Sequence, residues 1–155
     1  MLPAIERSAG NAFRGSSQAV VADDRVTPAR WYRPLVPRGL VWVAAEGEVP
    51  IGFACTEPFA DALHLWALAV RFDAQRQGAG RALVLAVAAD ARARDLPAVT
   101  LTTFRDIPWN GPFYARLGFV EVPHAEANPR LAGLRTHEAA LGLDVANRCV
   151  MRLAL

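Results

Sequence analysis

The residues best suited to chemistry lie between Gln75 and Arg81, where two glycines and two arginines precede an expected helix. Glycine lets the backbone approach a ligand closely and adopt positive φ. The N–H groups of a helix's first turn have no partners within the helix, and the helix dipole favours an anion there. Arg76 and Arg81 add positive charge on either side of Gly78 and Gly80. This pattern predicts a phosphate-binding turn, with a turn that only begins a helix as the structural alternative.

Two common nucleotide-binding motifs do not fit this turn. The dinucleotide motif needs a third glycine and an acidic residue about 20 positions later. The segment Gly78-Ala79-Gly80-Arg81-Ala82-Leu83 lacks that glycine, and no acid lies near Thr100. The nucleoside-triphosphate loop requires a lysine, and the chain contains none.

The turn lies between an apolar run and a helical run, and these two elements must position it. Leu63 to Val70 is strand-like. Arg81 to Arg94 is helical, with one apolar stripe formed by Leu83, Val84, Val87, Ala88 and Ala91. Val99 to Thr103 is the next strand. Strand, helix and strand predict a parallel pair with a crossover, whose carboxyl ends are where α/β sheets bind ligands.

The preceding residues predict a helix and a β-meander. Leu2 to Arg14 has a helical apolar face. Leu40 to Ala45 and Ile51 to Thr56 are strand-like and flank a hairpin turn. Between them and the first helix, Thr27 could cap a short helix with Pro28 in its first turn. Trp31 and Tyr32 in that segment would either line a substrate cleft or pack onto the core.

The segment after the fourth expected strand contains a second informative motif. Asn110 can cap a short helix that accepts Pro112 in its first turn. Gly118 suits the left-handed position after that helix, and Phe119 supplies the apolar contact. A strand near Val120, a helix over residues 131–143 and a strand over residues 148–153 follow. The last strand would close the sheet or pair with a second copy.

Two of these motifs together resemble the GNAT superfamily of N-acetyltransferases. They are Gln75-x-x-Gly78-x-Gly80 and Tyr114-x-x-x-Gly118-Phe119, separated by one helix and one strand. The resemblance implies an α/β fold with a mixed central sheet, an antiparallel meander plus a parallel β-α-β crossover, flanked by helices. It covers nearly the whole chain, as a single acetyltransferase domain over residues 1–155. It also implies acetyl-CoA as the co-substrate.

The resemblance further implies how acetyl-CoA is bound. Backbone groups of Leu68, Ala69 and Val70 would pair with the pantetheine arm like an added strand. Asn110 would bind the coenzyme near its pantetheine, although helix capping is an equal alternative for this residue. The pyrophosphate would be held by the turn residues, namely Gln75, Arg76, Gln77, Gly78, Ala79, Gly80 and Arg81.

Tyr114 would be the general acid of the implied reaction, with a packing role as its alternative. A neutral amine attacks the thioester, and the leaving thiolate needs a proton. A phenol with a pKa of about 10 is protonated at neutral pH and can supply it. The sequence does not fix a base. The base candidates are Glu57, His64 and Asp106 near strand ends, each with a solvated or capping role as its alternative. His124 lies in a late loop, and the adjacent His137 and Glu138 point to different helix faces, so they are not expected to form a metal or acid–base pair.

The composition sets the remaining expectations. With 155 residues and a net charge of +2, we expect one domain without a nucleic-acid surface, although Trp31 with Arg30, Arg33 and Arg38 is a weak indication of one. Cys55 and Cys149 lack metal-ligand spacing, so free thiols and no metal are expected. No run suits a membrane helix, and the start lacks signal-peptide character, which favours the cytoplasm.

The partners expected are therefore an amine of a small molecule or peptide, with no nucleic acid and no membrane. The sequence does not decide the oligomeric state, and a homodimer is one possibility. The alternative function is a non-catalytic acyl-CoA-binding regulator on the same fold.

Overall fold

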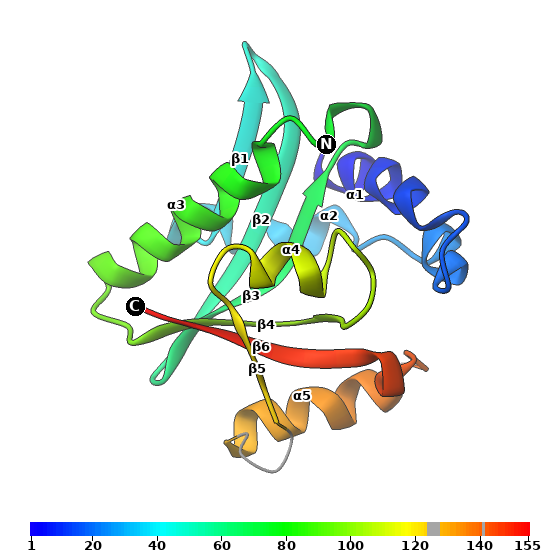
Figure 1. Cartoon of the computed structure of the whole chain (residues 1–155). Coiled ribbons are helices and arrows are strands. Elements are labelled where there is room, and N and C mark those ends of the chain that lie inside the picture. The colour runs from blue at the N-terminus through cyan, green and yellow to red at the C-terminus, as the bar shows by residue number, and fades with distance from the viewer. Residues whose placement is uncertain (124–127, 141) are drawn as a thin grey trace.

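The computed structural model describes residues 1–123, 128–140 and 142–155, which form a six-stranded mixed sheet flanked by helices (Figure 1). Its strand order is β1-β2-β3-β4-β6-β5. The first three strands form the predicted antiparallel meander, and β3 and β4 form the predicted parallel pair. The bounds are Val41–Glu46 (β1), Val49–Phe59 (β2), Ala62–Val70 (β3), Ala98–Phe104 (β4), Val120–Val122 (β5) and Arg148–Ala154 (β6).

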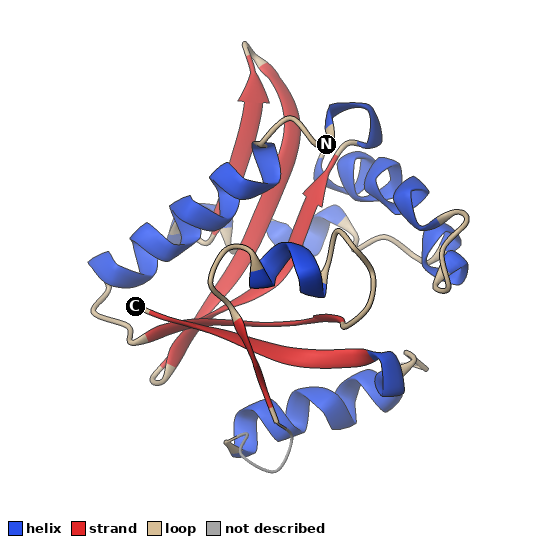
Figure 2. Cartoon of the chain, in the orientation of Figure 1, coloured by secondary structure: helices blue, strands red, loops and turns tan. Residues whose placement is uncertain are grey.

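Five α-helices accompany the sheet in the described part of the chain (Figure 2). The predicted helices are confirmed, with ends that shift by a few residues, and short 3-10 turns continue or join them. Residues 11–13, for example, continue the first helix as the 3-10 turn η1. The helix bounds are Leu2–Gly10 (α1), Ala29–Tyr32 (α2), Ala79–Ala93 (α3), Gly111–Ala115 (α4) and Pro129–Ala140 (α5).

The sheet is covered on two faces, and the residues of β2 alternate between them. Ala54 points into a core cluster that contains the predicted stripe of α3. Phe53 and Cys55 instead join a smaller cluster with Ile5 of α1 and Tyr32 of α2. All five stripe residues of α3 are buried, so this amphipathic helix holds the turn at its start against the sheet.

An extra residue in β3 reverses which side chains face α3. Cys55 of β2 pairs with Ala67, whereas the next residue, Thr56, pairs with Leu65, so Trp66 is a β-bulge. Before the bulge Leu65 belongs to the cluster under α3, and after it Leu68 packs there. A simple alternation along the strand does not predict this change.

Strands β3 and β4 diverge after a short parallel contact. They pair only from Leu63 to Leu65 on β3 and from Val99 to Leu101 on β4. β4 instead pairs with β6 along its whole length. The second half of β3 therefore has an edge that faces away from β2 and is not covered by β4.

The last strand lies inside the sheet. β6 pairs with β4 on one side and with β5 on the other, over Val150 to Arg152. Of the two alternatives for the C-terminal strand, the structure shows that it closes the sheet. The helix at Trp31 is confirmed, but Pro28 is its N-cap residue, and Thr27 donates its backbone N–H and hydroxyl to Glu6 instead of capping.

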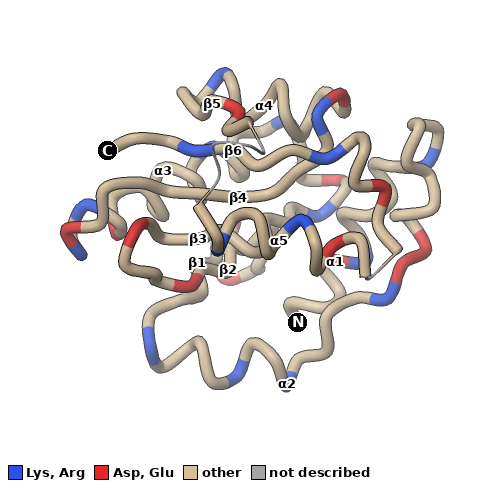
Figure 3. Tube along the Cα trace, turned by 90° about the horizontal axis from the view of Figure 1, so that it is seen from below, with Lys and Arg blue, Asp and Glu red and all other residues tan. Residues whose placement is uncertain are grey.

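Charged residues are distributed around the molecule, and the segment that includes α2 carries several arginines (Figure 3). Trp31 in α2 is 64% exposed, whereas Tyr32 is buried against Phe53. The packing role predicted for these two aromatic residues is therefore confirmed for Tyr32 only. Neither residue lines the cleft described below. Within the described residues, no helix has the length and apolar character needed to cross a membrane.

Candidate active site

A cleft of about 700 Å³ opens where β3 leaves β4. One wall comes from β3 and the turn after it, and the opposite wall comes from the loop after β4 and from α4. Residues of α1 and η1 lie at one end of the cleft. Its lining includes Ala9, Phe13, Leu68, Val70, Gln75, Arg76, Gly78, Gly80, Arg81, Trp109, Asn110, Phe113 and Tyr114.

The edge of β3 presents free backbone groups to this cleft. The Arg71 N–H donates to the Ile51 carbonyl oxygen at 2.8 Å, so Arg71 directs its polar groups toward β2. Hydrogen-bonded positions alternate along an antiparallel pair. Ala69 therefore also faces β2, whereas Leu68 and Val70 direct their N–H and C=O groups away from it.

One of these backbone groups, the Val70 carbonyl oxygen, already accepts a hydrogen bond within the protein. The side-chain amide of Gln75 donates to the Val70 carbonyl oxygen at 3.0 Å. This bond fixes the turn to the end of β3. It leaves the Val70 N–H and both polar groups of Leu68 available to an extended ligand lying along the strand.

The turn after β3 concentrates hydrogen-bond donors. Among the described residues, no backbone N–H from Arg76 to Arg81 has a protein acceptor, and the first helical bond of α3 runs from Ala82 to Gly78 at 2.9 Å. We call these N–H groups the amide run. Arg76 and Gly78 adopt positive φ, 62° and 94°, which turns the chain into the helix. The side chains of Arg76 and Arg81 are exposed and have no partner among the described residues.

Helix α4 places Tyr114 at the cleft opposite β3. Gly111 begins this helix close to the end of β4, where an added Cβ would lie 2.5 Å from the Arg105 carbonyl oxygen. Tyr114 is 8% exposed and packs edge-on against Phe119 at 5.6 Å between ring centroids. Burial raises the pKa of Tyr114 above its ordinary value, so the phenol is protonated at neutral pH.

The side chain of Asn110 does not cap α4. It lies at the N-cap position, but its Oδ1 accepts a hydrogen bond from the Thr103 hydroxyl at 2.8 Å. Side-chain capping, one of two predicted roles, is therefore wrong. The residue lines the cleft next to Tyr114, and its amide N–H₂ has no acceptor among the described residues.

None of the described base candidates lines the cleft. His64 lies on the first half of β3 and is 1% exposed, with its Nδ1 3.0 Å from the Thr100 hydroxyl. Its burial, with a smaller effect from Arg130, lowers its pKa to about 3. Glu57 accepts a hydrogen bond from the Trp66 indole at 2.9 Å.

The third base candidate and the late acid and histidines complete the set. Asp106 is exposed outside the cleft, and Glu138 forms an ion pair with Arg148. His137 lies in the last turn of α5. His124 is outside the described residues. Of the candidates that the structure describes, none is therefore placed to take the amine proton directly within the cleft.

Both cysteines are free and buried, as predicted. Burial raises the pKa of Cys55 to about 11 and that of Cys149 to about 11. A thiol with this pKa is protonated at neutral pH and is a poor nucleophile. Neither lines the cleft. In the described part of the chain, no three His, Cys, Asp or Glu side chains are grouped to hold a metal ion.

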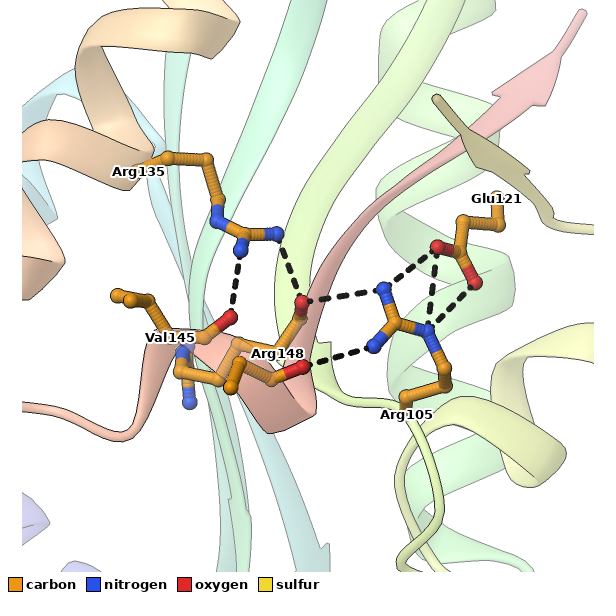
Figure 4. Close-up of polar contacts among 6 residues, drawn as sticks. Arg105, Glu121, Arg135, Val145 and Arg148 are labelled. Carbon is orange, nitrogen blue, oxygen red and sulfur yellow. Dashed lines mark hydrogen bonds and ion pairs between the residues drawn. The ribbon is translucent and has the colours of Figure 1, made fainter. Parts of the chain in front are cut away.

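Arg105 and Arg135 donate hydrogen bonds to Glu121 and to backbone carbonyl oxygens, and they connect the loop before α4 with later segments (Figure 4). Arg105 pairs with Glu121 at 2.8 Å and donates to the carbonyl oxygens of Ala146 and Arg148. Arg135 of α5 donates to the Arg148 carbonyl oxygen at 2.7 Å, and the Arg148 side chain pairs with Glu138. We call these residues the arginine network, namely Arg105, Glu121, Arg135, Glu138 and Arg148. It ties the end of β4 to β5, β6 and α5.

The structure brings most predicted site residues to one cleft but not all of them. Ala69, Gln77 and Ala79 do not line it. Ala69 is buried among the residues under α1, and the Gln77 side chain donates to the Asp73 carbonyl oxygen at 3.2 Å. The backbone N–H groups of Gln77 and Ala79 nevertheless belong to the amide run.

Sequence reasoning missed the aromatic end of the cleft. Phe13 packs edge-on against Trp109 at 5.7 Å and against Phe104 at 5.9 Å between ring centroids. Phe13 and Ala9 come from the first helix and η1, far away in the sequence from the other lining residues. The sequence predicts the apolar face of the first helix, but not that Phe13 packs against Phe104 and Trp109.

Comparison with known proteins agrees with this architecture. A family model described as an acetyltransferase (GNAT) domain matches residues 37–121. The chain is similar in structure to N-acetylglutamate synthase from Neisseria gonorrhoeae, complexed with coenzyme A and N-acetyl-glutamate, with a TM-score of 0.71 and 16% identity. That match covers 99% of this chain and 32% of the synthase, so the chain spans about a third of that protein.

Two further structures match with a similar fold. The PaiA N-acetyltransferase from Thermoplasma acidophilum, in complex with coenzyme A, has a TM-score of 0.69 and 15% identity over 99% of this chain and 91% of its own. The ribosomal-protein-S18-alanine N-acetyltransferase from Escherichia coli has a TM-score of 0.55 and 21% identity over 74% and 68%. At these identities the likeness shows the fold alone.

Proposed function

Because the chain belongs to the GNAT acetyltransferase family, we propose that it transfers the acetyl group of acetyl-CoA to a primary amine of a small molecule or peptide. The observation that carries this proposal is the amide run, which lies in the same cleft as the free edge of β3 and Tyr114. Backbone N–H groups at a helix start suit a phosphate, and a free strand edge suits an extended amide chain. Acetyl-CoA contains both groups.

The protein's own residues would divide the work as follows. The amide run, with Arg76 and Arg81, would bind the pyrophosphate. Leu68 and Val70 would offer backbone groups to the pantetheine arm, and an N–H group there would polarise the thioester carbonyl. The Asn110 amide, oriented by Thr103, would bind nearby.

Tyr114 would donate the proton that the leaving thiolate needs. Its raised pKa keeps it protonated, and a protonated phenol can donate a hydrogen bond to the sulfur and then the proton itself. A neutral amine would attack the thioester carbonyl directly within a ternary complex. As the C–N bond forms and the C–S bond breaks, the nitrogen would lose a proton to water, and a proton from water would restore the Tyr114 phenol. The two buried thiols, which lie outside the cleft, do not support an acyl-cysteine intermediate.

Replacement of Tyr114 by phenylalanine tests this assignment. Tyr114→Phe keeps the packing against Phe119 but removes the proton donor. We expect turnover to fall by about 100-fold or more, as is typical for loss of general acid catalysis, with the acetyl-CoA affinity unchanged. Calorimetric titration with acetyl-CoA and a steady-state assay of thiol release measure the two quantities separately.

The matched control is Thr56→Val, which also removes a buried hydroxyl but at a residue of β2 that lies outside the cleft. Normal turnover in Tyr114→Phe would remove this residue from the mechanism. Acetyl-CoA binding without transfer to any amine in the wild-type protein would instead favour the non-catalytic acyl-CoA-binding regulator.

A further inference from the structure

A second cavity, of about 250 Å³, adjoins the cleft beside Leu68. It shares Ala9, Phe13 and Leu68 with the cleft, and its other lining residues come from α1, the 3-10 turn η2 (Ala19–Asp23), the segment after η2, and Ala69. None of the amide run lines it. A ligand in this cavity would therefore reach Leu68 without contact with the phosphate-binding turn.

The cavity exists because η2 lies close to the end of α1. An added Cβ at Gly10 would lie 3.3 Å from the Ala22 carbonyl oxygen, which is tighter than most Cβ contacts. The Arg7 guanidinium donates to the same carbonyl oxygen at 3.4 Å. These contacts hold the two backbone segments together, and the exposed residues Asp24 and Arg25 follow directly after η2.

The lining combines charges of both signs. Glu6 and Asp24 supply carboxylates, and Arg7 and Arg25 supply guanidinium groups. Asp24 and Arg25 have no side-chain partner among the described residues. Both are exposed, so each is available to a ligand group of opposite charge.

Glu6 has a fixed orientation. Its Oε2 accepts hydrogen bonds from the Thr27 N–H and the Tyr32 hydroxyl, both at 3.0 Å, and its Oε1 accepts one from the Thr27 hydroxyl at 3.2 Å. A carboxylate has about four acceptor positions. Glu6 therefore retains about one acceptor position for a ligand N–H, on a carboxylate that three donors already hold in place.

From these observations we propose that the second cavity binds the acceptor, and that this acceptor is a free α-amino acid. Glu6 and Asp24 would bind its ammonium group, and Arg25 its carboxylate. An amine without a carboxylate would form no ion pair with Arg25, and a peptide N-terminus has no carboxylate next to its amine. The inference rests on the proposed acetyl transfer, because it names the substrate class of the same site.

The test compares three forms of each acceptor. A panel of α-amino acids, their α-carboxamides and the corresponding amines without a carboxylate is assayed for thiol release from acetyl-CoA. We expect kcat/KM to be about tenfold or more higher for at least one free amino acid than for its carboxamide, since a charge-assisted guanidinium–carboxylate pair is lost in the carboxamide. Equal rates for all three forms would overturn the inference.

Arg25→Gln tests whether Arg25 causes the preference for the free amino acid over its carboxamide. We expect kcat/KM for the amino acid to fall to the value for its carboxamide, with the carboxamide rate unchanged. Arg33→Gln is the control, because Arg33 is exposed in the same N-terminal region and lines neither cavity. A preference that persists in Arg25→Gln would overturn the assignment.

Calorimetry separates this inference from the proposed function. The same amino acid is titrated into the protein saturated with coenzyme A, for the wild type and for Arg25→Gln. Binding that depends on Arg25 supports the acceptor site even if no acetyl transfer is detected, in which case only the proposed function fails. Acetyl transfer to other amines, without amino-acid binding, would overturn this inference alone.

Discussion

The amide run and the arginine network both concentrate hydrogen-bond donors, but only the network pairs most of them within the protein. In the described part of the chain, its exceptions are Nε of Arg135 and Nε of Arg148. In the network, Arg105, Arg135 and Arg148 donate to carboxylates and to backbone carbonyl oxygens. In the amide run, consecutive backbone N–H groups and the neighbouring guanidinium groups of Arg76 and Arg81 have no acceptor among the described residues.

This difference separates residues that stabilise the fold from residues that bind a ligand. Most residues of the amide run are exposed, so water satisfies their N–H groups in the free protein, and a phosphate can replace that water. A donor with a protein acceptor contributes to folding. Variants in the network should therefore change the free energy of unfolding, and variants in the amide run should change the affinity for acetyl-CoA.

The largest effect on stability is expected at the pair between Arg148 and Glu138. Their side chains are 13% and 10% exposed, and the Arg148 guanidinium also lies 4.7 Å from the centroid of the Phe104 ring. Arg148→Ala would leave the Glu138 carboxylate buried without its cation. We expect the free energy of unfolding to fall by about 3–5 kcal/mol, measured by urea denaturation.

A surface pair provides the control for Arg148→Ala. Arg14 and Asp23 are 58% and 73% exposed, and Arg14→Ala should cost about 1 kcal/mol or less. The acetyl-CoA affinity of the folded fraction should stay unchanged in both variants. Equal losses of stability in the two variants would contradict the structural role assigned to the network.

The second effect concerns the amide run itself. A Cβ at Gly80 would make only ordinary contacts, 3.6 Å to Phe113 and 3.8 Å to Val70, so Gly80→Asp is compatible with the fold. Its carboxylate would compete with the phosphate for the amide run and repel it. We expect the acetyl-CoA affinity to fall by about 100-fold, or about 2.7 kcal/mol, in calorimetric titration.

Gly133→Asp in α5 is the matched control, since a Cβ at Gly133 meets nothing within 4 Å. This variant should bind acetyl-CoA normally. Thermal denaturation confirms that both proteins are folded. A folded Gly80→Asp protein with wild-type affinity would show that the amide run is only a turn.

The third prediction concerns His64, a buried group near the Arg130–Asp61 ion pair rather than the cleft. Its pKa is about 3 in the folded state and about 6.5 when unfolded. Between these values the unfolded state binds more protons, so stability is retained above pH 6.5 and is lost as the pH falls toward 3. At pH 5 the loss is about 2 kcal/mol relative to pH 7.

His64→Leu removes this titration, and its unfolding free energy should fall less between pH 7 and pH 5 than that of the wild type. His137→Asn, at an exposed histidine of α5, should keep the wild-type dependence. Urea denaturation at the two pH values gives the comparison. The same fall with pH in His64→Leu and the wild type would show that His64 does not cause it.

The sequence predicted the elements of the fold more reliably than their arrangement. The apolar stripe of α3 and the left-handed Gly118 follow from local periodicity and backbone preference, and both were predicted. The bulge at Trp66 and the divergence of β3 from β4 depend on pairing between distant segments. The cleft is a consequence of that divergence, so its shape could not be predicted locally.

The candidate site divides in the same way. The amide run is a local feature of a glycine turn and a helix start, and its residues were predicted from spacing. The hydrogen bond between Thr103 and Asn110, the burial of His64 and the contribution of Phe13 all join segments far apart in the chain. Tertiary packing decides these roles, and sequence periodicity does not encode them.

The smallest effect is expected for the two arginines beside the amide run. Arg76 and Arg81 are exposed, so water and salt screen their attraction for a phosphate. Arg81→Ala should weaken acetyl-CoA binding by about tenfold at low salt and by less at high salt, because the backbone N–H groups remain. Arg92→Ala, in the last turn of the same helix, is the control and should bind normally. Calorimetry at two salt concentrations measures how much of the acetyl-CoA affinity comes from the arginine side chain and how much remains with the backbone N–H groups. If Arg81→Ala abolished binding, the side chains rather than the amide run would dominate phosphate recognition, and the contrast with the arginine network would no longer rest on unpartnered backbone donors.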